Sequence, residues 1–242
     1  DYFGNREETR NNTNDNRNRQ FEIINQVNDK GLNYDFSYKL NDNFQLNGGY
    51  QFSKTDILYV YKTNFTTQNN LLLSVENSSN TTNAMFSEVK YNNGTSFINF
   101  GVRANNFSSA NEWFFEPRLY ASTKISDSFT LKTSGEIKNQ AVSQIIEYRN
   151  SGIGLENNIW AAANKSIPIL NSKQIAVGIL YQKKGWNLDV DFYKKKVKGI
   201  TLMTDAIANN TQANRIPFYI SGESDIIGLD VLLKKRFGNY RS

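Results

Sequence analysis

The chain has 242 residues and a formal net charge of +5, and its 13% aromatic content is too high for a disordered protein although only 38% of its residues are hydrophobic. It contains no Cys and no His, which excludes disulfides, thiolate nucleophiles, His-dependent triads and the commonest metal ligands. Carboxylate, Lys and Tyr chemistry remains, but no local motif arranges these groups as catalysts. We therefore expect a folded protein that is not an enzyme, with no cofactor and no metal site.

The positive charge does not predict a nucleic-acid partner. Basic residues are spread along the chain, and the densest run, Lys194-Lys195-Lys196 with Lys198, lies close to Asp189 and Asp191. No segment approaches the roughly 20 apolar residues that a membrane-spanning helix requires. The chain starts at Asp1 without an initiator Met or a signal peptide and stops just after a turn signal at 238–239. We expect both ends to be cuts through a longer protein.

Alternating apolar and polar residues, the pattern of a strand with two different faces, begin at residue 32. Apolar residues occupy every second position over 32–40, Asn41-Asp42-Asn43 supplies a turn, and the alternation resumes over 44–52. This pattern predicts a β-hairpin with one apolar and one polar face.

The same pattern recurs along the chain. The remaining predicted strands cover 85–91, 98–102, 117–125, 129–137, 175–181, 186–192 and 227–233. The sequence thus predicts about nine strands in which tight turns alternate with long polar segments. These segments are rich in Asn, Ser and Thr and cover about 54–82, 104–114, 141–171 and 204–216.

Three features favour a transmembrane barrel over a soluble sandwich. Tight turns that alternate with long polar segments are typical of outer-membrane barrels, which have short periplasmic turns and longer extracellular loops. Strands of about 9–11 residues match the thickness of a bilayer. Aromatic residues also gather near the short turns, as in an interfacial girdle; they are Tyr38, Phe44, Tyr91, Phe129, Tyr181 and Trp186. The predicted fold class is all-β, an antiparallel transmembrane β-barrel of which the chain forms a part.

Several stretches resemble the TonB-dependent outer-membrane receptors. Phe114-Phe115-Glu116-Pro117-Arg118, continuing to Gln140, resembles the Pro-Arg strand entry, short turn and returning strand of that family. The series 154–160, 164–170 and 172–201 is similar to the subgroup that carries an N-terminal carboxypeptidase-like regulatory domain, and 84–89 with 100–103 resembles a strand pair ending in Gly-x-Arg. The order and spacing of these stretches carry the resemblance over roughly residues 30–235.

The resemblance implies that residues 1–242 are part of one barrel domain, from the later half of a barrel that the family builds from about 22 strands around a plug. The plug and the end of the barrel are expected outside this chain. It also implies a location in the outer membrane of a Gram-negative cell and TonB-energised uptake of a scarce solute, such as an iron chelate, a vitamin, a glycan or a peptide. The implied partners are the TonB complex, acting through the plug and N-terminal region, outer-membrane lipid and a surface lipoprotein.

Loop aromatics are the candidates for solute binding, because their side chains stack on ligands at low entropic cost. Arg149 offers a guanidinium to an anionic group. For each of these residues the alternative is packing between loops or a place in the outer girdle. The aromatic candidates are Tyr59, Tyr61, Phe65, Trp113, Tyr148 and Trp160.

Charged residues on the polar face indicate a cross-strand charge ladder inside the barrel rather than ligand contacts. They are Arg103, Arg118, Lys124, Glu136, Asp189 and Asp230. Asp189 and Asp191 share one face, and we interpret them as solvated carboxylates of the lumen wall, not as an acid–base pair.

Two other functions stay open. The first is a passive outer-membrane porin or assembly barrel, and the second is a secreted all-β binding protein with its apolar faces in a sandwich core. A plug domain upstream in the parent gene separates an importer from a passive barrel. Dependence on detergent separates both barrels from the secreted protein, since a lipid-facing band does not stay soluble in water.

Overall fold

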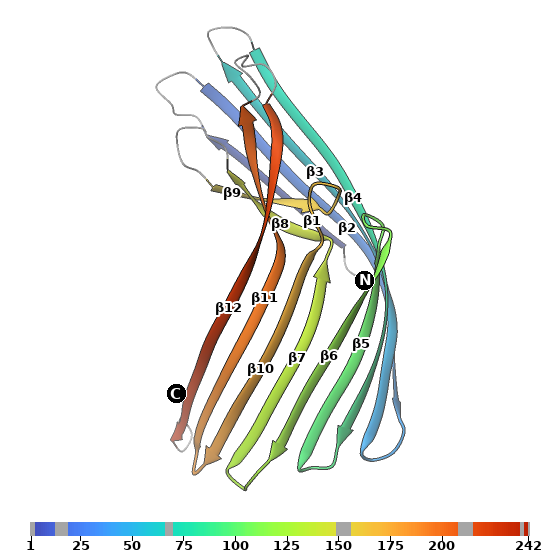
Figure 1. The fold of residues 1–242 in the computed structure, drawn as a ribbon, viewed down its shortest axis with the longest axis vertical. Coiled ribbons are helices and arrows are strands. Elements are labelled where there is room, and N and C mark those ends of the chain that lie inside the picture. Colours follow the sequence, from blue (N-terminus) through green and yellow to red (C-terminus); the bar gives the residue numbers. More distant parts are fainter. Residues whose placement is uncertain are drawn as a thin grey trace.

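All regular structure in the described part of the chain is β-strand (Figure 1). The computed structural model describes residues 3–12, 19–65, 70–148, 156–207, 215–237 and 240–241, and the side chains of 24–60, 77–146, 158–203 and 219–236. Within these ranges no helix is long and apolar enough to cross a membrane.

The strands form a curved antiparallel wall in which consecutive strands are neighbours, except that a hairpin of β8 and β9 leaves the wall between β7 and β10 (Figure 1). The expected all-β barrel architecture is confirmed. The strands are β1 (Phe3–Asn12), β2 (Arg19–Lys39), β3 (Phe44–Phe65), β4 (Asn70–Asn92), β5 (Ser96–Phe107), β6 (Glu112–Lys124), β7 (Phe129–Gln140), β8 (Val142–Tyr148), β9 (Glu156–Ala162), β10 (Leu170–Lys183), β11 (Trp186–Ile207), β12 (Arg215–Phe237) and β13 (Tyr240–Arg241).

Side-chain hydrogen bonds and positive backbone angles fix the tight turns. The Asn41 Oδ1 atom accepts hydrogen bonds from the backbone N–H groups of Asn43 and Phe44, both at 2.9 Å. Between β10 and β11, Lys184 and Gly185 have φ angles of 47° and 80°, as a two-residue hairpin turn of the primed type requires. These turns lie together at one end of the wall (Figure 1).

The strands are far longer than the sequence pattern indicates. β3 and β4 contain 22 and 23 residues, about twice the 9–11 that a membrane crossing needs. The expected loop at 54–82 is therefore wrong for most of its length, since β3 continues to Phe65 and β4 begins at Asn70. In this continuation of β3 the side chains of Ile57, Tyr59 and Val60 are all buried, so apolar residues follow one another without alternation while the ladder with β4 continues.

The nine predicted strands are all present as β2–β7 and β10–β12, but β1, β8, β9 and β13 were not predicted. β1 has the sequence FGNREETRNN and pairs with the first half of β2, from Phe21 to Lys30. With no apolar face to bury, such a strand carries no periodic signal. The other expected loops are also partly strand: β5 and β6 occupy most of 104–114, β8 and β9 lie within 141–171, and β11 and β12 reach into 204–216.

One face of the wall is apolar and exposed. On β2 the side chains of Leu32 and Tyr34 are 58% and 65% exposed, and on β12 Ile227 and Leu229 are 67% and 63% exposed. A band of this kind is stable only against lipid, which fits the outer surface of a transmembrane barrel.

Aromatic pairs mark the turn end of this apolar band, as the predicted girdle requires. The ring centroids of Phe44 and Tyr91 lie 4.8 Å apart, and those of Phe129 and Tyr181 lie 4.9 Å apart. The ammonium of Lys235 lies 4.5 Å from the ring centroid of Trp186.

The opposite face is polar and lines the lumen. Lys132 of β7 reaches across β10 to two carboxylates of β11, with its Nζ atom 2.5 Å from Asp189 Oδ1 and 2.9 Å from Asp191 Oδ2. Gly178 lies between them in the ladder, and a Cβ atom there would collide with Asp191. The cross-strand charge ladder is thus confirmed at Asp189.

The other predicted members of the ladder behave differently. Arg103 donates hydrogen bonds to Gln51 and Asn105 instead of pairing with an acid. Glu136 forms its ion pair with Lys138 of the same strand, at 2.9 Å. Arg118, Lys124 and Asp230 form no ion pair with any residue that the structure describes.

Replacing Lys132 by Met should destabilise the barrel, because two neighbouring carboxylates would lose their shared cation. We expect the free energy of unfolding to fall by about 1.5–3 kcal/mol, the range for hydrogen bonds to charged groups. Urea unfolding of the full natural protein in detergent micelles measures this change. Lys132→Arg is the matched control and should keep most of the stability; an unchanged midpoint for Lys132→Met would contradict the bridging role.

Candidate functional site

The β8–β9 hairpin crosses the concave side of the wall, and we call these two strands the strap (Figure 1). β8 pairs in parallel with β11, where Ile146 lies opposite Leu202. β9 pairs with β8 and contacts β2, β3 and β4 from the other arm of the wall. The strap therefore connects two parts of the barrel wall that are far apart in strand order.

A small hydrophobic cluster holds the strap against the wall. It combines Tyr59 of β3, Ile145 of β8, Ile159 of β9, Met203 of β11 and Ile167, which lies between β9 and β10. Each of these side chains is at most 4% exposed. A second cluster packs Phe107, Ala141 and Ala163 at the base of the strap. These two clusters contain most of the buried apolar side chains of the described residues, because the rest of the wall is a single layer.

Asn25 of β2 anchors the strap through its side-chain amide. The backbone N–H of Trp160 donates to Asn25 Oδ1 at 2.8 Å, and Asn25 Nδ2 donates to the Trp160 carbonyl at 3.4 Å. Asn25 is only 6% exposed, so its amide provides hydrogen-bond partners for the N–H and C=O of Trp160 at a place that water does not reach.

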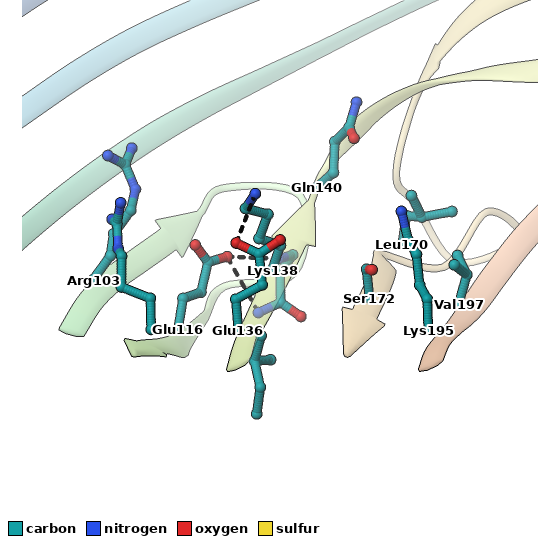
Figure 2. Close-up of a pocket in the computed structure, with 12 residues that line it drawn as sticks. Arg103, Glu116, Glu136, Lys138, Gln140, Leu170, Ser172, Lys195 and Val197 are labelled. Carbon is teal, nitrogen blue, oxygen red and sulfur yellow. Dashed lines mark hydrogen bonds and ion pairs between the residues drawn. The ribbon is translucent and has the colours of Figure 1, made fainter. Parts of the chain in front are cut away.

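A pocket of about 430 Å³ lies on the lumen side below the strap, where β7 ends and β10 begins (Figure 2). Six of the side chains that line it are charged. The basic ones are Arg103, Arg118, Lys138 and Lys195, and the acidic ones are Glu116 and Glu136.

Most of these charges are engaged with neighbours. Glu116 Oε1 accepts hydrogen bonds from the backbone N–H and the side-chain amide of Asn139, at 2.6 and 3.3 Å. Glu136 pairs with Lys138, and both contacts are visible in Figure 2. Arg103 is held by Gln51 Oε1 at 2.5 Å and Asn105 Oδ1 at 2.8 Å.

Arg118 and Lys195 are the exceptions, since neither forms a hydrogen bond or an ion pair with the described residues. They lie on the same row of the sheet, with Arg118 opposite Glu136, Glu136 opposite Gln174 and Gln174 opposite Lys195. The pocket lining carries four cations and two carboxylates, and the two cations that form no ion pair with the described residues provide a site for an anionic group.

The structure separates the aromatic candidates instead of gathering them. Tyr59 belongs to β3 and is 3% exposed inside the cluster below the strap, so its place is that of a packing residue. Trp113 belongs to β6, lies opposite Asn106 and is 51% exposed. Trp160 lies on the strap, where its backbone contacts Asn25.

The remaining candidates are placed only in part. Tyr61 and Phe65 lie in β3 and Tyr148 in β8, in strands and not in loops, and their side chains are outside the described set. Arg149 lies outside the described residues. Solute binding by these residues stays a prediction.

Sequence reasoning placed Arg118 on the lumen wall but did not connect it with Lys195, which appeared only as part of a basic run. The sequence did contain a signal, because every second residue of a strand points to the same face. Counting from Asp189 in steps of two places Lys195 on the polar face. No group of three or more Asp and Glu side chains among the described residues is placed to hold a metal ion.

Comparisons with known proteins support the fold. No protein-family model and no curated protein sequence matches the chain. Among solved structures, the chain is similar to the copper transporter OprC (TM-score 0.64, 11% identity, covering 95% of this chain and 39% of that one) and to the siderophore receptor PirA from Acinetobacter baumannii (TM-score 0.55, 16% identity, 92% and 36%). It is also similar to the RagAB peptide importer (TM-score 0.55, 14% identity, 91% and 29%).

These similarities establish that the fold is that of an outer-membrane β-barrel, as the sequence resemblance implied, and the expected outer-membrane location agrees with this fold. The chain spans 29–39% of the length of these three solved structures. A shared fold does not show that this chain transports the same solutes as those proteins.

Replacing Asn25 by Ala should loosen the strap, because the buried N–H and C=O of Trp160 lose their partners. The expected cost of about 1–3 kcal/mol in local stability corresponds to roughly 5- to 150-fold faster amide exchange in β9. Hydrogen–deuterium exchange of the peptide covering 156–162 measures it. Asn28→Ala, an exposed change on the same strand, is the control, and equal exchange rates in the two variants would contradict the anchoring role.

Proposed function

We propose that the chain is part of the barrel of a TonB-dependent receptor that imports a scarce solute bearing anionic groups through the outer membrane. The observation that carries the proposal is the position of Arg118 and Lys195 in a lumen pocket directly below the strap. A polar lumen crossed by an inward-folded hairpin suits controlled passage of a bound solute better than free diffusion.

The solved structures support an import role over enzymatic activity. Their names describe a siderophore receptor, a copper transporter and a peptide importer. We propose that residues 1–242 form part of one barrel domain, that energy comes from TonB acting on a plug elsewhere in the protein, and that a surface lipoprotein assists capture.

Deletion of the gene tests the import role. The deletion strain should grow poorly when one nutrient class limits growth, and the panel consists of ferric siderophores, copper, cobalamin, oligosaccharides and oligopeptides. Loss of TonB in the parent strain should reproduce the same defect. A nutrient defect that does not depend on TonB would instead favour the passive porin, and no defect on any nutrient would contradict an import role.

The pocket is tested by removing its two free cations. For the nutrient identified above, Arg118→Gln with Lys195→Gln should lower uptake about 100-fold or more, because each of the two lost charge-assisted hydrogen bonds costs about 1.5–3 kcal/mol. Lys138→Gln is the matched control, since Lys138 already pairs with Glu136 and should matter less. Normal uptake by the double variant at normal surface expression would remove the pocket from the transport route.

A further inference from the structure

The apolar outer face contains a groove of about 410 Å³ at the point where β6, β7 and β10 meet. Gly135 lies in the floor of this groove, between Leu119 of β6 and Ile175 of β10 on the same row of the sheet. Because Gly135 has no side chain, a gap opens on the outer face above it. The apolar residues that line this gap include Phe100, Pro117 and Ile137.

The groove lies at the end of the apolar band that is farthest from the short turns. On β10 the outward-facing residues run from Tyr181 at the turn end through Ile175, and the next one is Lys173. On β11 the apolar series ends at Phe192 and is followed by Lys194. Since short turns of outer-membrane barrels are periplasmic, the groove faces the outer leaflet of the membrane.

Two lysines at the rim, Lys173 and Lys194, form no ion pair with the described residues. Both line the groove, and their ladder neighbours on this face include Ile137 and Ile227. Lys196 differs, because its Nζ atom lies 3.1 Å from Glu223 Oε1 and 3.7 Å from Asp225 Oδ2.

The two unpaired lysines suit a ligand with more than one phosphate. Lys173 lies directly opposite Lys196, so Lys194 is its diagonal neighbour, and such pairs are about 7–8 Å apart. Long lysine side chains reach from the edge of an apolar surface to the headgroup level, where a phosphate accepts charge-assisted hydrogen bonds.

We propose that this groove is a binding site for a phosphorylated glycolipid of the outer leaflet, with an acyl chain over Gly135 and phosphates on Lys173 and Lys194. The acyl chain matches the apolar walls, and the phosphates match the charge at the rim. Basic sites beside a hydrophobic membrane surface recognise anionic lipid headgroups in this way. The groove and the lumen pocket share the lining residues Arg118, Glu136 and Ile137, but Lys173, Lys194 and Gly135 line the groove alone, so the lipid site does not depend on solute import.

Native mass spectrometry of the full natural protein in detergent tests the site, with diphosphoryl lipid A, dephosphorylated lipid A and phosphatidylglycerol as probes. Diphosphoryl lipid A should bind best. Lys173→Gln with Lys194→Gln should weaken its binding about tenfold or more, since each lysine near a membrane surface contributes about a fivefold factor. Gly135→Val should also reduce binding by filling the groove. A Cβ atom at Gly135 meets nothing nearer than 3.9 Å, so this variant should fold.

Two control variants separate the site from general effects. Lys183→Gln with Lys184→Gln removes two charges at the turn end of the same hairpin, and Ala121→Val adds bulk to the outer face outside the groove. Both should bind lipid A like the natural protein. Equal binding by all four variants would overturn the proposal, and a preference for phosphatidylglycerol that responds to the groove variants would overturn the assignment to a glycolipid. Heat-dependent gel mobility confirms that each variant is folded.

Discussion

Backbone hydrogen bonding in hydrocarbon is the constraint on which this structure depends. A strand inside a bilayer has no water to satisfy its N–H and C=O groups, so every strand in the wall must be paired along its whole buried length. The continuous registers from β2 to β7 and from β10 to β12 meet this requirement. Pairing then divides the side chains between lipid and lumen, because neighbouring residues point to opposite faces.

A wall of one layer has almost no interior, and this explains where its buried side chains are. Within the part of the chain that the structure describes, two layers meet where the strap folds onto the wall, and Tyr59, Ile145 and Met203 are buried there. Elsewhere the lumen face depends on polar contacts that bridge neighbouring strands. Lys132 spans a whole strand to reach Asp189 because Gly178 leaves the space above β10 open.

The sequence was informative where the membrane restricts it. Alternation located the nine strands that cross the bilayer and the tight turns that join them, since lipid on one face and water on the other select residue type by parity. It failed beyond the apolar band, where the sequence of β1 has no alternation and the continuation of β3 is buried at Ile57, Tyr59 and Val60. It also could not find the strap, whose short strands are defined by contacts such as Asn25 with Trp160, 135 residues apart.

The same logic limited the prediction of the site. The aromatic candidates were chosen because they are aromatic, and residue type alone does not show whether a side chain is free to stack on a ligand. Tyr59 is buried in a packing cluster, whereas Trp113 is exposed and lies apart from it. The pocket became visible only when the register placed Arg118 and Lys195 on one row across four strands. Register over such distances depends on every hairpin between them, and a single sequence does not encode it locally.

The basic run on β11 shows how the alternation assigns separate roles to adjacent residues. Lys194 faces the membrane beside the groove, Lys195 faces the lumen pocket, and Lys196 faces outward again and pairs with Glu223. These three lysines are adjacent in the sequence, but in the barrel wall Lys195 lies on the opposite face of the sheet from Lys194 and Lys196. A register slip of one residue would exchange the two faces, placing Asp189 and Asp191 in the lipid band and Val190 and Phe192 in the lumen. The alternation of Asp189 to Phe192 therefore fixes the register of β11, and the face of each lysine in the run follows from it.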